Sequence, residues 1–164
     1  MHENTTPPVP TNKRRAFVTI VFAWLVAGTL DITAASLYYP LAFRFRLILL
    51  YQNIASGVLG DKAFSGGAMT AALGLAFHFA IALVWTIVFF LIYPRILARL
   101  RNVFAVAVTY GMLVWFVMNL IVLPLSRVNH APFYFGRELI AASFLVLCIG
   151  LPLSFIIGRY YSNR

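Results

Sequence analysis

Residues 68–93 read AMTAALGLAFHFAIALVWTIVFFLIY and contain no Asp, Glu, Lys or Arg. An apolar run of about 18 residues or more predicts a helix that crosses the ~30 Å hydrocarbon core of a bilayer. The chain has further long apolar runs, and the predicted spans are 16–39, 68–93, 103–123 and 139–157. Proline cannot donate to the helical hydrogen-bond ladder. We therefore expect the first three spans to end at Pro40, Pro94 and Pro124.

The composition agrees with a membrane protein. Of the 164 residues, 62% are hydrophobic and 10% are charged, and the mean hydropathy is +0.89. Soluble domains carry about 25% charged residues. The sequence predicts an all-α integral membrane four-helix bundle that forms a single domain, residues 16–158. A disordered cytoplasmic tail, residues 1–15, and a short cytoplasmic tail, residues 159–164, flank this domain.

The segment between the first two spans is too long for a turn and too apolar for a free loop. Within residues 43–60, the apolar side chains fall at helical spacing, opposite Gln52, Asn53 and Ser56. This pattern predicts an extra amphipathic helix at the membrane interface. Two readings stay open: a helix that only covers the bundle, or a lid over an outward-facing cavity.

The basic residues indicate the orientation, because Lys and Arg are more frequent in cytoplasmic loops. With the N-terminus inside, the cytoplasmic side holds Lys13, Arg14, Arg15, Arg95, Arg99, Arg101, Arg159 and Arg164. The opposite side holds Arg44, Arg46, Lys62, Arg127 and Arg137. The excess predicts that both termini are cytoplasmic. The net charge of +9 is divided among short loops, so we expect the lipid bilayer to be the partner and no nucleic acid to bind.

Asp31 and His78 are the candidate functional residues within the spans. A charged side chain at a helix centre costs about 2.5–3.5 kcal/mol on insertion scales. Counted at the helical rise, the two residues lie ~12 and ~15 Å below the outer surface. Small residues flank both of them, which favours close packing of the two helices. We therefore expect Asp31 and His78 to face each other, either as structural contact or as a proton-linked or ligand-binding pair.

A wider polar cluster is predicted in the outer half of the bundle. Asn119 on the third span and Glu138 at the start of the fourth would join Asp31 and His78, with Arg127 or Arg137 at the rim. Both additions also have purely structural explanations. Asn119 can hydrogen-bond between helices, and an acid in the first turn of a helix suits the helix dipole.

Other chemistry has little support in the sequence. Cys148 is the one cysteine, and it lies in an apolar run where a thiol packs without reacting. No metal-ligand spacing, phosphate-binding loop or nucleophile elbow is present. We predict no enzymatic activity, no metal and no cofactor.

Two stretches resemble a known family. GLAFHFAIALVWTIVFFLIYPRI (74–96) and YGMLVWFVMNLIVLPLS (110–126), followed by a last helix that starts with Glu, are similar to the YagU-like family of bacterial inner-membrane proteins. The resemblance implies a multi-pass protein of the bacterial cytoplasmic membrane, loosely associated with acid resistance. It implies no reaction and no ligand. His78 is the only residue that can be matched to the family's pattern, and the family assigns no established role to it.

Three functions follow as hypotheses. The first is a small bundle whose Asp31–His78 pair is proton-linked and serves acid-stress or pH homeostasis. The second is a structural or partner-binding subunit of a larger membrane complex, or of a homo-oligomer. The third is a carrier or enzyme for a lipid or other apolar molecule, which would occupy the cavity beneath the interfacial helix.

Overall fold

The computed structural model describes residues 13–128 and 134–162, and every element within these ranges is a helix. Four helical stretches are long and apolar enough to cross a membrane: Lys13–Phe43, Gly67–Leu100, Val103–Leu125 and Phe135–Ser162. The predicted all-α fold with four long apolar helices is confirmed. Residues 13–15 belong to the first helix and residues 159–162 to the last, so the predicted tails are shorter than expected. Residues 1–12 and 163–164 of these tails lie outside the described residues.

The first two stretches are single helices, α1 (Lys13–Phe43) and α3 (Gly67–Leu100). The other two each contain a π-helical turn. The third stretch consists of α4 (Val103–Val117), the π-helical η2 (Met118–Val122) and α5 (Leu123–Leu125). The fourth consists of α6 (Phe135–Phe144), the π-helical η3 (Leu145–Gly150) and α7 (Leu151–Ser162). Between α1 and α3 lie α2 (Leu47–Leu59) and the 3₁₀-helical η1 (Gly60–Ser65).

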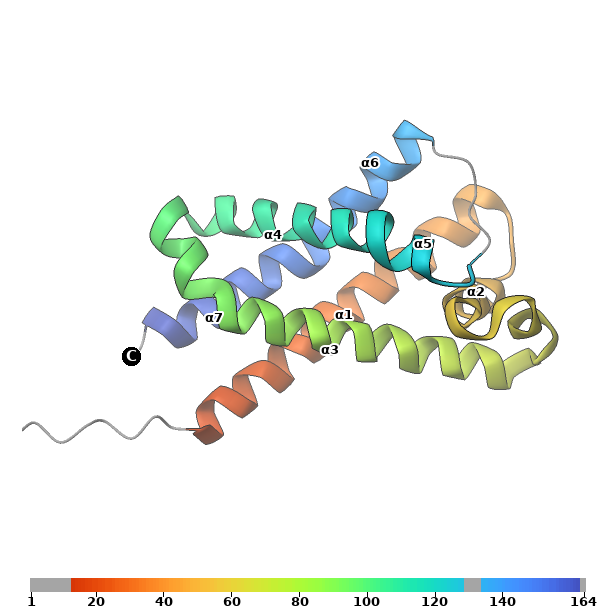
Figure 1. The fold of residues 1–164 in the computed structure, drawn as a ribbon, viewed down its shortest axis with the longest axis horizontal. Coiled ribbons are helices and arrows are strands. Elements are labelled where there is room, and N and C mark those ends of the chain that lie inside the picture. Colours follow the sequence, from red (N-terminus) through yellow and green to blue (C-terminus); the bar gives the residue numbers. More distant parts are fainter. Residues whose placement is uncertain (1–12, 129–133, 163–164) are drawn as a thin grey trace, which may run out of the picture.

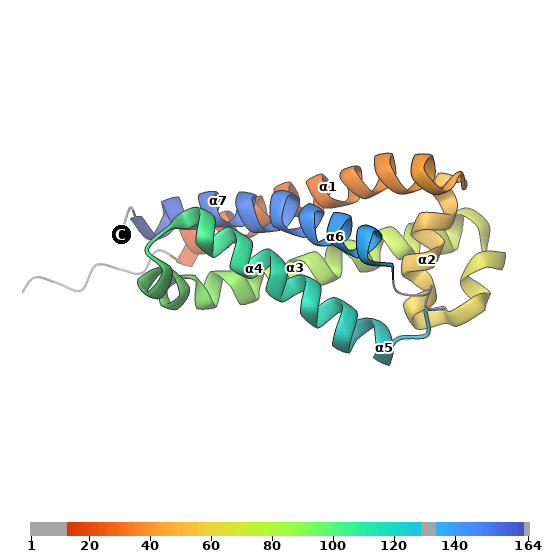
Figure 2. The same ribbon diagram turned by 90° about the horizontal axis from the view of Figure 1, so that it is seen from above.

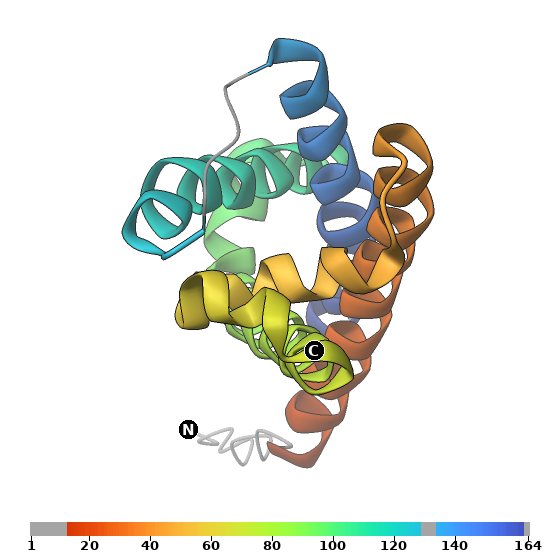
Figure 3. The ribbon, with the colours of Figure 1, turned by 90° about the vertical axis from the view of Figure 1, so that its right-hand side faces the viewer.

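The four long stretches extend along the long axis of the molecule, and α2 crosses this direction at one end (Figures 1 and 2). Figure 3 shows α2 and η1 lying across the ends of the long helices. The start of α1, the α3–α4 turn and the end of α7 gather at the opposite end. We call this the basic end, because it carries Lys13, Arg14, Arg15, Arg95, Arg99, Arg101 and Arg159.

Close contacts between helices form the core. Large fully buried side chains from α3, α4 and α7 fill its centre, among them Phe89, Tyr110 and Leu153. Ala23 and Ala27 of α1 pack against this cluster. Small residues let these helix backbones approach one another, which is how apolar helices associate where the solvent is itself apolar.

The predicted ends at the prolines are wrong, because α1 continues beyond Pro40 and α3 beyond Pro94. Proline leaves the carbonyl four residues earlier without its usual donor. At Pro94 this carbonyl belongs to Phe90, and the Tyr161 hydroxyl donates a hydrogen bond to it at 2.9 Å. A side chain of α7 therefore replaces the missing backbone donor.

The third stretch also continues through its proline, but by a different device. Pro124 is the second residue after the π-helical turn η2, and Pro152 in the fourth stretch is the second residue after η3. A π-helical turn widens the backbone spiral and changes which carbonyls are bonded. Irregular turns of this kind accommodate proline within a membrane helix.

Helix α2 lies within the predicted interfacial segment and packs against α3 with its polar side. Gln52 and Ser56 are 3% and 2% exposed, whereas Val58 on the apolar side is 57% exposed. The Gln52 amide donates to the Gly67 carbonyl at 3.0 Å and to the Thr70 hydroxyl at 3.3 Å. Two polar side chains of α2 are thus buried against α3, whereas Asn53 is exposed, and hydrogen bonds of Gln52 fix the contact.

Candidate functional site

His78 lies at the contact between α3 and α1. Its Nε2 atom is 2.9 Å from the carbonyl oxygen of Gly28. A carbonyl only accepts hydrogen bonds, so Nε2 carries the hydrogen and donates it, and Nδ1 is the ring nitrogen that remains for a further proton. A Cβ atom at Gly28 would lie 3.0 Å from the Phe79 ring, so the absence of a side chain there allows this approach.

Asp31 is on the same side of α1, three residues beyond Gly28. It lies within electrostatic range of His78, so the structure brings the predicted pair into one region. The direct contact is absent, however: within residues 13–128 and 134–162, the Asp31 carboxyl makes no hydrogen bond or ion pair. The Gly28 carbonyl takes the hydrogen bond of His78 instead. Asp31 and His78 are therefore electrostatic neighbours and not a hydrogen-bonded pair.

Two further side chains lie near Asp31. Tyr39, two turns later on α1, and Cys148, in the π-helical turn η3, are both within electrostatic range of the carboxyl. Asp31 thus belongs to the space where α1, α3 and the fourth stretch meet. Its side chain is half-buried, and the acid has no compensating donor among the described residues.

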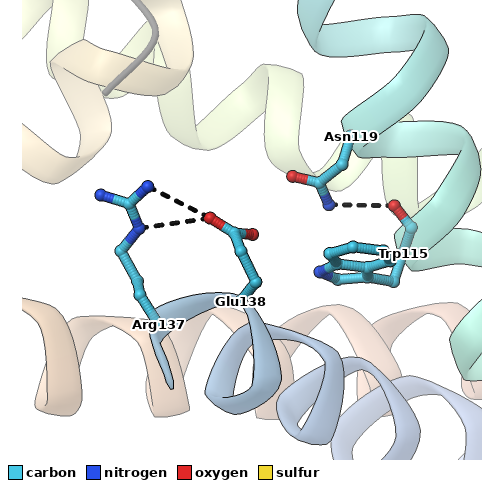
Figure 4. A network of polar contacts seen from close by, with 4 residues as sticks. All are labelled: Trp115, Asn119, Arg137 and Glu138. Atoms are coloured by element: carbon cyan, nitrogen blue, oxygen red, sulfur yellow. Dashed lines mark hydrogen bonds and ion pairs between the residues drawn. The ribbon is translucent and has the colours of Figure 1, made fainter. Parts of the chain in front are cut away.

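A second polar group lies nearer the α2 end. Arg137 and Glu138 form an ion pair at 3.1 Å, with side chains 25% and 15% exposed. In Figure 4 the Glu138 carboxylate lies between the Arg137 guanidinium and the side chains of Trp115 and Asn119. Glu138 is in the first turn of α6, as its helix-dipole explanation requires.

Asn119 does not form the expected hydrogen bond between helices. Its Nδ2 atom donates to the Trp115 carbonyl, one turn earlier in the same stretch, at 2.9 Å. Asn119 is the second residue of the π-helical turn η2, in which the backbone bonding is altered. The side chain therefore supplies a donor to a carbonyl of its own helix.

Arg127 lies apart from the cluster. Its backbone N–H donates to the Gly57 carbonyl at 3.0 Å, and its side chain lies beside Gly60, at the end of α2. Arg127 makes no ion pair with any described residue. Of the two predicted rim arginines, only Arg137 is next to an acid of the cluster.

The predicted four-residue cluster is therefore divided into an inner group, Asp31 and His78, and an outer group, Glu138 and Asn119. Tyr39 connects them, because it is within electrostatic range of both Asp31 and Glu138. Tyr39 is not among the candidate residues selected from the sequence. Its only signal was that Tyr39 follows Asp31 by two helical turns.

A cavity of about 630 Å³ lies beneath α2, where the lid reading requires one. Its walls are mainly apolar and aromatic, and they include Tyr39, Phe43, Leu50 and Phe64, with Arg137 at the edge. A smaller cavity of about 170 Å³ separates α4 from α6 beside Trp115 and Glu138. The indole Nε1 of Trp115 is buried there, without a hydrogen-bond partner in the described part of the chain.

The four long apolar helices identify the chain as a multi-pass helical membrane protein. A scan of the chain against protein-family models gives no match, and neither do searches of curated proteins and of solved structures. The resemblance to the YagU-like family therefore stays a prediction. Across the described ranges, no three His, Cys, Asp or Glu side chains come together as a metal site.

Proposed function

We propose that this protein is a proton-responsive protein of the bacterial cytoplasmic membrane, in which the charge states of Asp31 and His78 are coupled and change how α1 packs on α3. One observation carries the proposal. An acid without a hydrogen-bond partner among the described residues lies in a membrane-spanning helix, within electrostatic range of an imidazole that bonds the same helix.

The energetics favour coupling between the two groups. A lone charge in a membrane helix costs about 2.5–3.5 kcal/mol on insertion scales. Asp31 and His78 avoid a net charge when both are neutral or when both are charged. Adding or removing one proton breaks this balance in a region of low dielectric constant. The packing around the pair should therefore respond to pH.

The hydrogen bond to Gly28 shapes this response. Because Nε2 already donates to that carbonyl, a proton taken up by His78 goes to Nδ1 and leaves the bond in place. The imidazolium then strengthens the bond, since charged donors form stronger hydrogen bonds. Protonation would draw α3 toward α1, and deprotonation would weaken this contact.

A nearby tryptophan can report on this contact. Trp24 Nε1 donates to the Phe79 carbonyl at 2.7 Å, one helical turn from the Gly28–His78 bond. A variant with Trp85→Phe and Trp115→Phe keeps Trp24 as the only tryptophan. Its emission, measured in lipid nanodiscs across pH 4–9, should change with pH because the α1–α3 contact changes.

Three substitutions in the single-tryptophan background test the assignment. Asp31→Asn and His78→Gln should each flatten the pH response, because either change removes one of the coupled groups. Glu138→Gln is the matched control, since it also removes an acid but lies in the outer group. A response that persists in Asp31→Asn together with His78→Gln contradicts the proposal.

The orientation with both termini in the cytoplasm is part of the proposal. Both described chain ends lie at the basic end. Counted over residues 13–128 and 134–162, the basic end has seven Lys or Arg residues and the α2 end has five. The positive-inside rule favours a cytoplasmic basic end. Cysteine labelling at position 162 and at position 62 in intact cells would distinguish the two orientations.

A carrier of a lipid or other apolar molecule is the second candidate, supported by the 630 Å³ cavity beneath α2. Pockets of this size and apolar lining suit a small hydrophobic ligand. Leu50→Trp would fill the cavity from α2. Native mass spectrometry should detect a copurified apolar molecule on the wild-type protein and less of it on Leu50→Trp. An equal amount on both proteins contradicts this candidate.

A further inference from the structure

A cleft of about 780 Å³ lies at the basic end, away from both polar groups of the candidate site. It is formed by the first turns of α1, the last turns of α3 and α7, and the start of α4. The cleft is open and not an enclosed cavity. It is the largest of the cavities described above.

Two arginines on different helices line the cleft. Arg15 comes from α1 and Arg159 from α7, and both side chains are exposed. No acid lines the cleft within the described residues. The three acids in those ranges, Asp31, Asp61 and Glu138, belong to other parts of the molecule. Guanidinium groups bind phosphate in a planar, bidentate geometry, so two arginines on one cleft suit an anionic phosphate group.

The walls of the cleft are apolar. Phe22 on α1 is 57% exposed and Phe155 on α7 is 52% exposed, and both line the cleft. On membrane-spanning helices these surfaces face acyl chains. An anion with hydrocarbon chains fits this combination of charged rim and apolar walls better than a soluble anion does.

Ser154 is an independent observation that points to a binding site in the cleft. It lines the cleft and is 0% exposed, and its hydroxyl has no hydrogen-bond partner within the ranges that the structure describes. Buried hydroxyl groups are normally paired. Ser154 precedes Arg159 by five residues on α7, which places it about 7.5 Å deeper at the helical rise.

We propose that the cleft binds an anionic phospholipid of the cytoplasmic leaflet. Its phosphate would lie between Arg15 and Arg159, its ester oxygens would accept a hydrogen bond from Ser154, and its acyl chains would follow Phe22 and Phe155. Basic pockets between membrane helices on the cytoplasmic side have the charge that such headgroups require. The choice of leaflet rests on the proposed orientation, whereas binding in the cleft is independent of the Asp31–His78 pair.

The test uses native mass spectrometry of the full chain in detergent, with added phosphatidylglycerol or phosphatidylcholine of identical acyl chains. The wild-type protein should retain phosphatidylglycerol preferentially. Arg15→Gln with Arg159→Gln should weaken this binding about tenfold or more, because each basic residue contributes to anionic lipid binding. Both side chains are exposed, so the change does not disturb the core.

Arg95→Gln with Arg99→Gln is the matched control. It removes the same charge from the same end, but neither residue lines the cleft. This control should change the affinity by less than about twofold. An equal loss in both double variants contradicts the proposal, because it indicates diffuse attraction to the basic end. Equal retention of the two lipids contradicts it as well.

Ser154→Ala provides a second, charge-neutral readout. It should weaken phosphatidylglycerol binding about threefold to tenfold, since one hydrogen bond is lost. Competition with soluble glycerol 3-phosphate separates a lipid site from a free phosphate site. Full displacement by glycerol 3-phosphate, or unchanged binding in both Ser154→Ala and the Arg15–Arg159 double variant, overturns the assignment.

Discussion

Replacing Gly74 with alanine should destabilise the protein, because Gly74 is where α2 crosses α3. A Cβ atom at this position would overlap the backbone carbonyl of Tyr51 and lie 3.2 Å from the backbone nitrogen of Ala55. Backbone atoms cannot rotate away as a side chain can, so α2 itself has to move. Overpacking of this kind costs about 1–3 kcal/mol.

Two further contributions determine the net loss of stability in Gly74→Ala. Alanine is favoured over glycine within a helix by about 0.5–1 kcal/mol, which offsets part of the clash. Displacing α2 also strains the Gln52 hydrogen bonds to Gly67 and Thr70, which contribute about 1 kcal/mol each. We expect Gly74→Ala to lower the free energy of unfolding by about 1–3 kcal/mol.

Gly57→Ala is the control from the same contact region. Its Cβ would meet Val128 and Ser126 at 3.7 and 3.8 Å, which is ordinary van der Waals contact. Gly57 is inside α2, so alanine there should be neutral or stabilise by up to about 1 kcal/mol. The assay is reversible unfolding in mixed micelles, followed by circular dichroism. The reasoning fails if Gly74→Ala is as stable as the wild type, or if the two variants lose equal stability.

The remaining predictions concern buried hydrogen bonds. Tyr161→Phe should lower the free energy of unfolding by about 0.5–1.5 kcal/mol, because the Phe90 carbonyl loses its donor. In the Pro94→Ala background, Tyr161→Phe should lower the free energy of unfolding by less, because the alanine supplies a backbone N–H to the Phe90 carbonyl. A double-mutant cycle in micelles measures the difference between the two losses of stability. Gln52→Leu should cost about 1–3 kcal/mol by leaving the Gly67 carbonyl without that donor, as measured by the same unfolding assay.

The four long helices were predictable because their signal is local. Each membrane-spanning helix must itself be long and apolar enough to cross the hydrocarbon core, independently of its neighbours. Local composition therefore indicates the spans. That Asp31 and His78 lie in one region could also be predicted from the sequence. Small residues mark where two helices can approach, and the helical rise gives the depth of each residue.

What the sequence missed depends on distant partners. The helix continues through Pro94 because Tyr161, far along the chain, donates to the freed carbonyl. Asn119 lies in a π-helical turn and bonds a carbonyl of its own helix. The buried side of α2 follows from hydrogen bonds that Gln52 makes to α3. None of these contacts has a periodic pattern that would predict it.

The protonation of His78 itself gives the most direct test. Nitrogen-15 spectra of histidine-labelled protein in nanodiscs would follow the imidazole across pH 4–9. Because the proposed function couples Asp31 to His78, the pH response of the His78 nitrogen signals should change in Asp31→Asn and should stay as in the wild type in Glu138→Gln. Superimposable curves for the wild type and Asp31→Asn would show that the carboxyl and the imidazole do not act together.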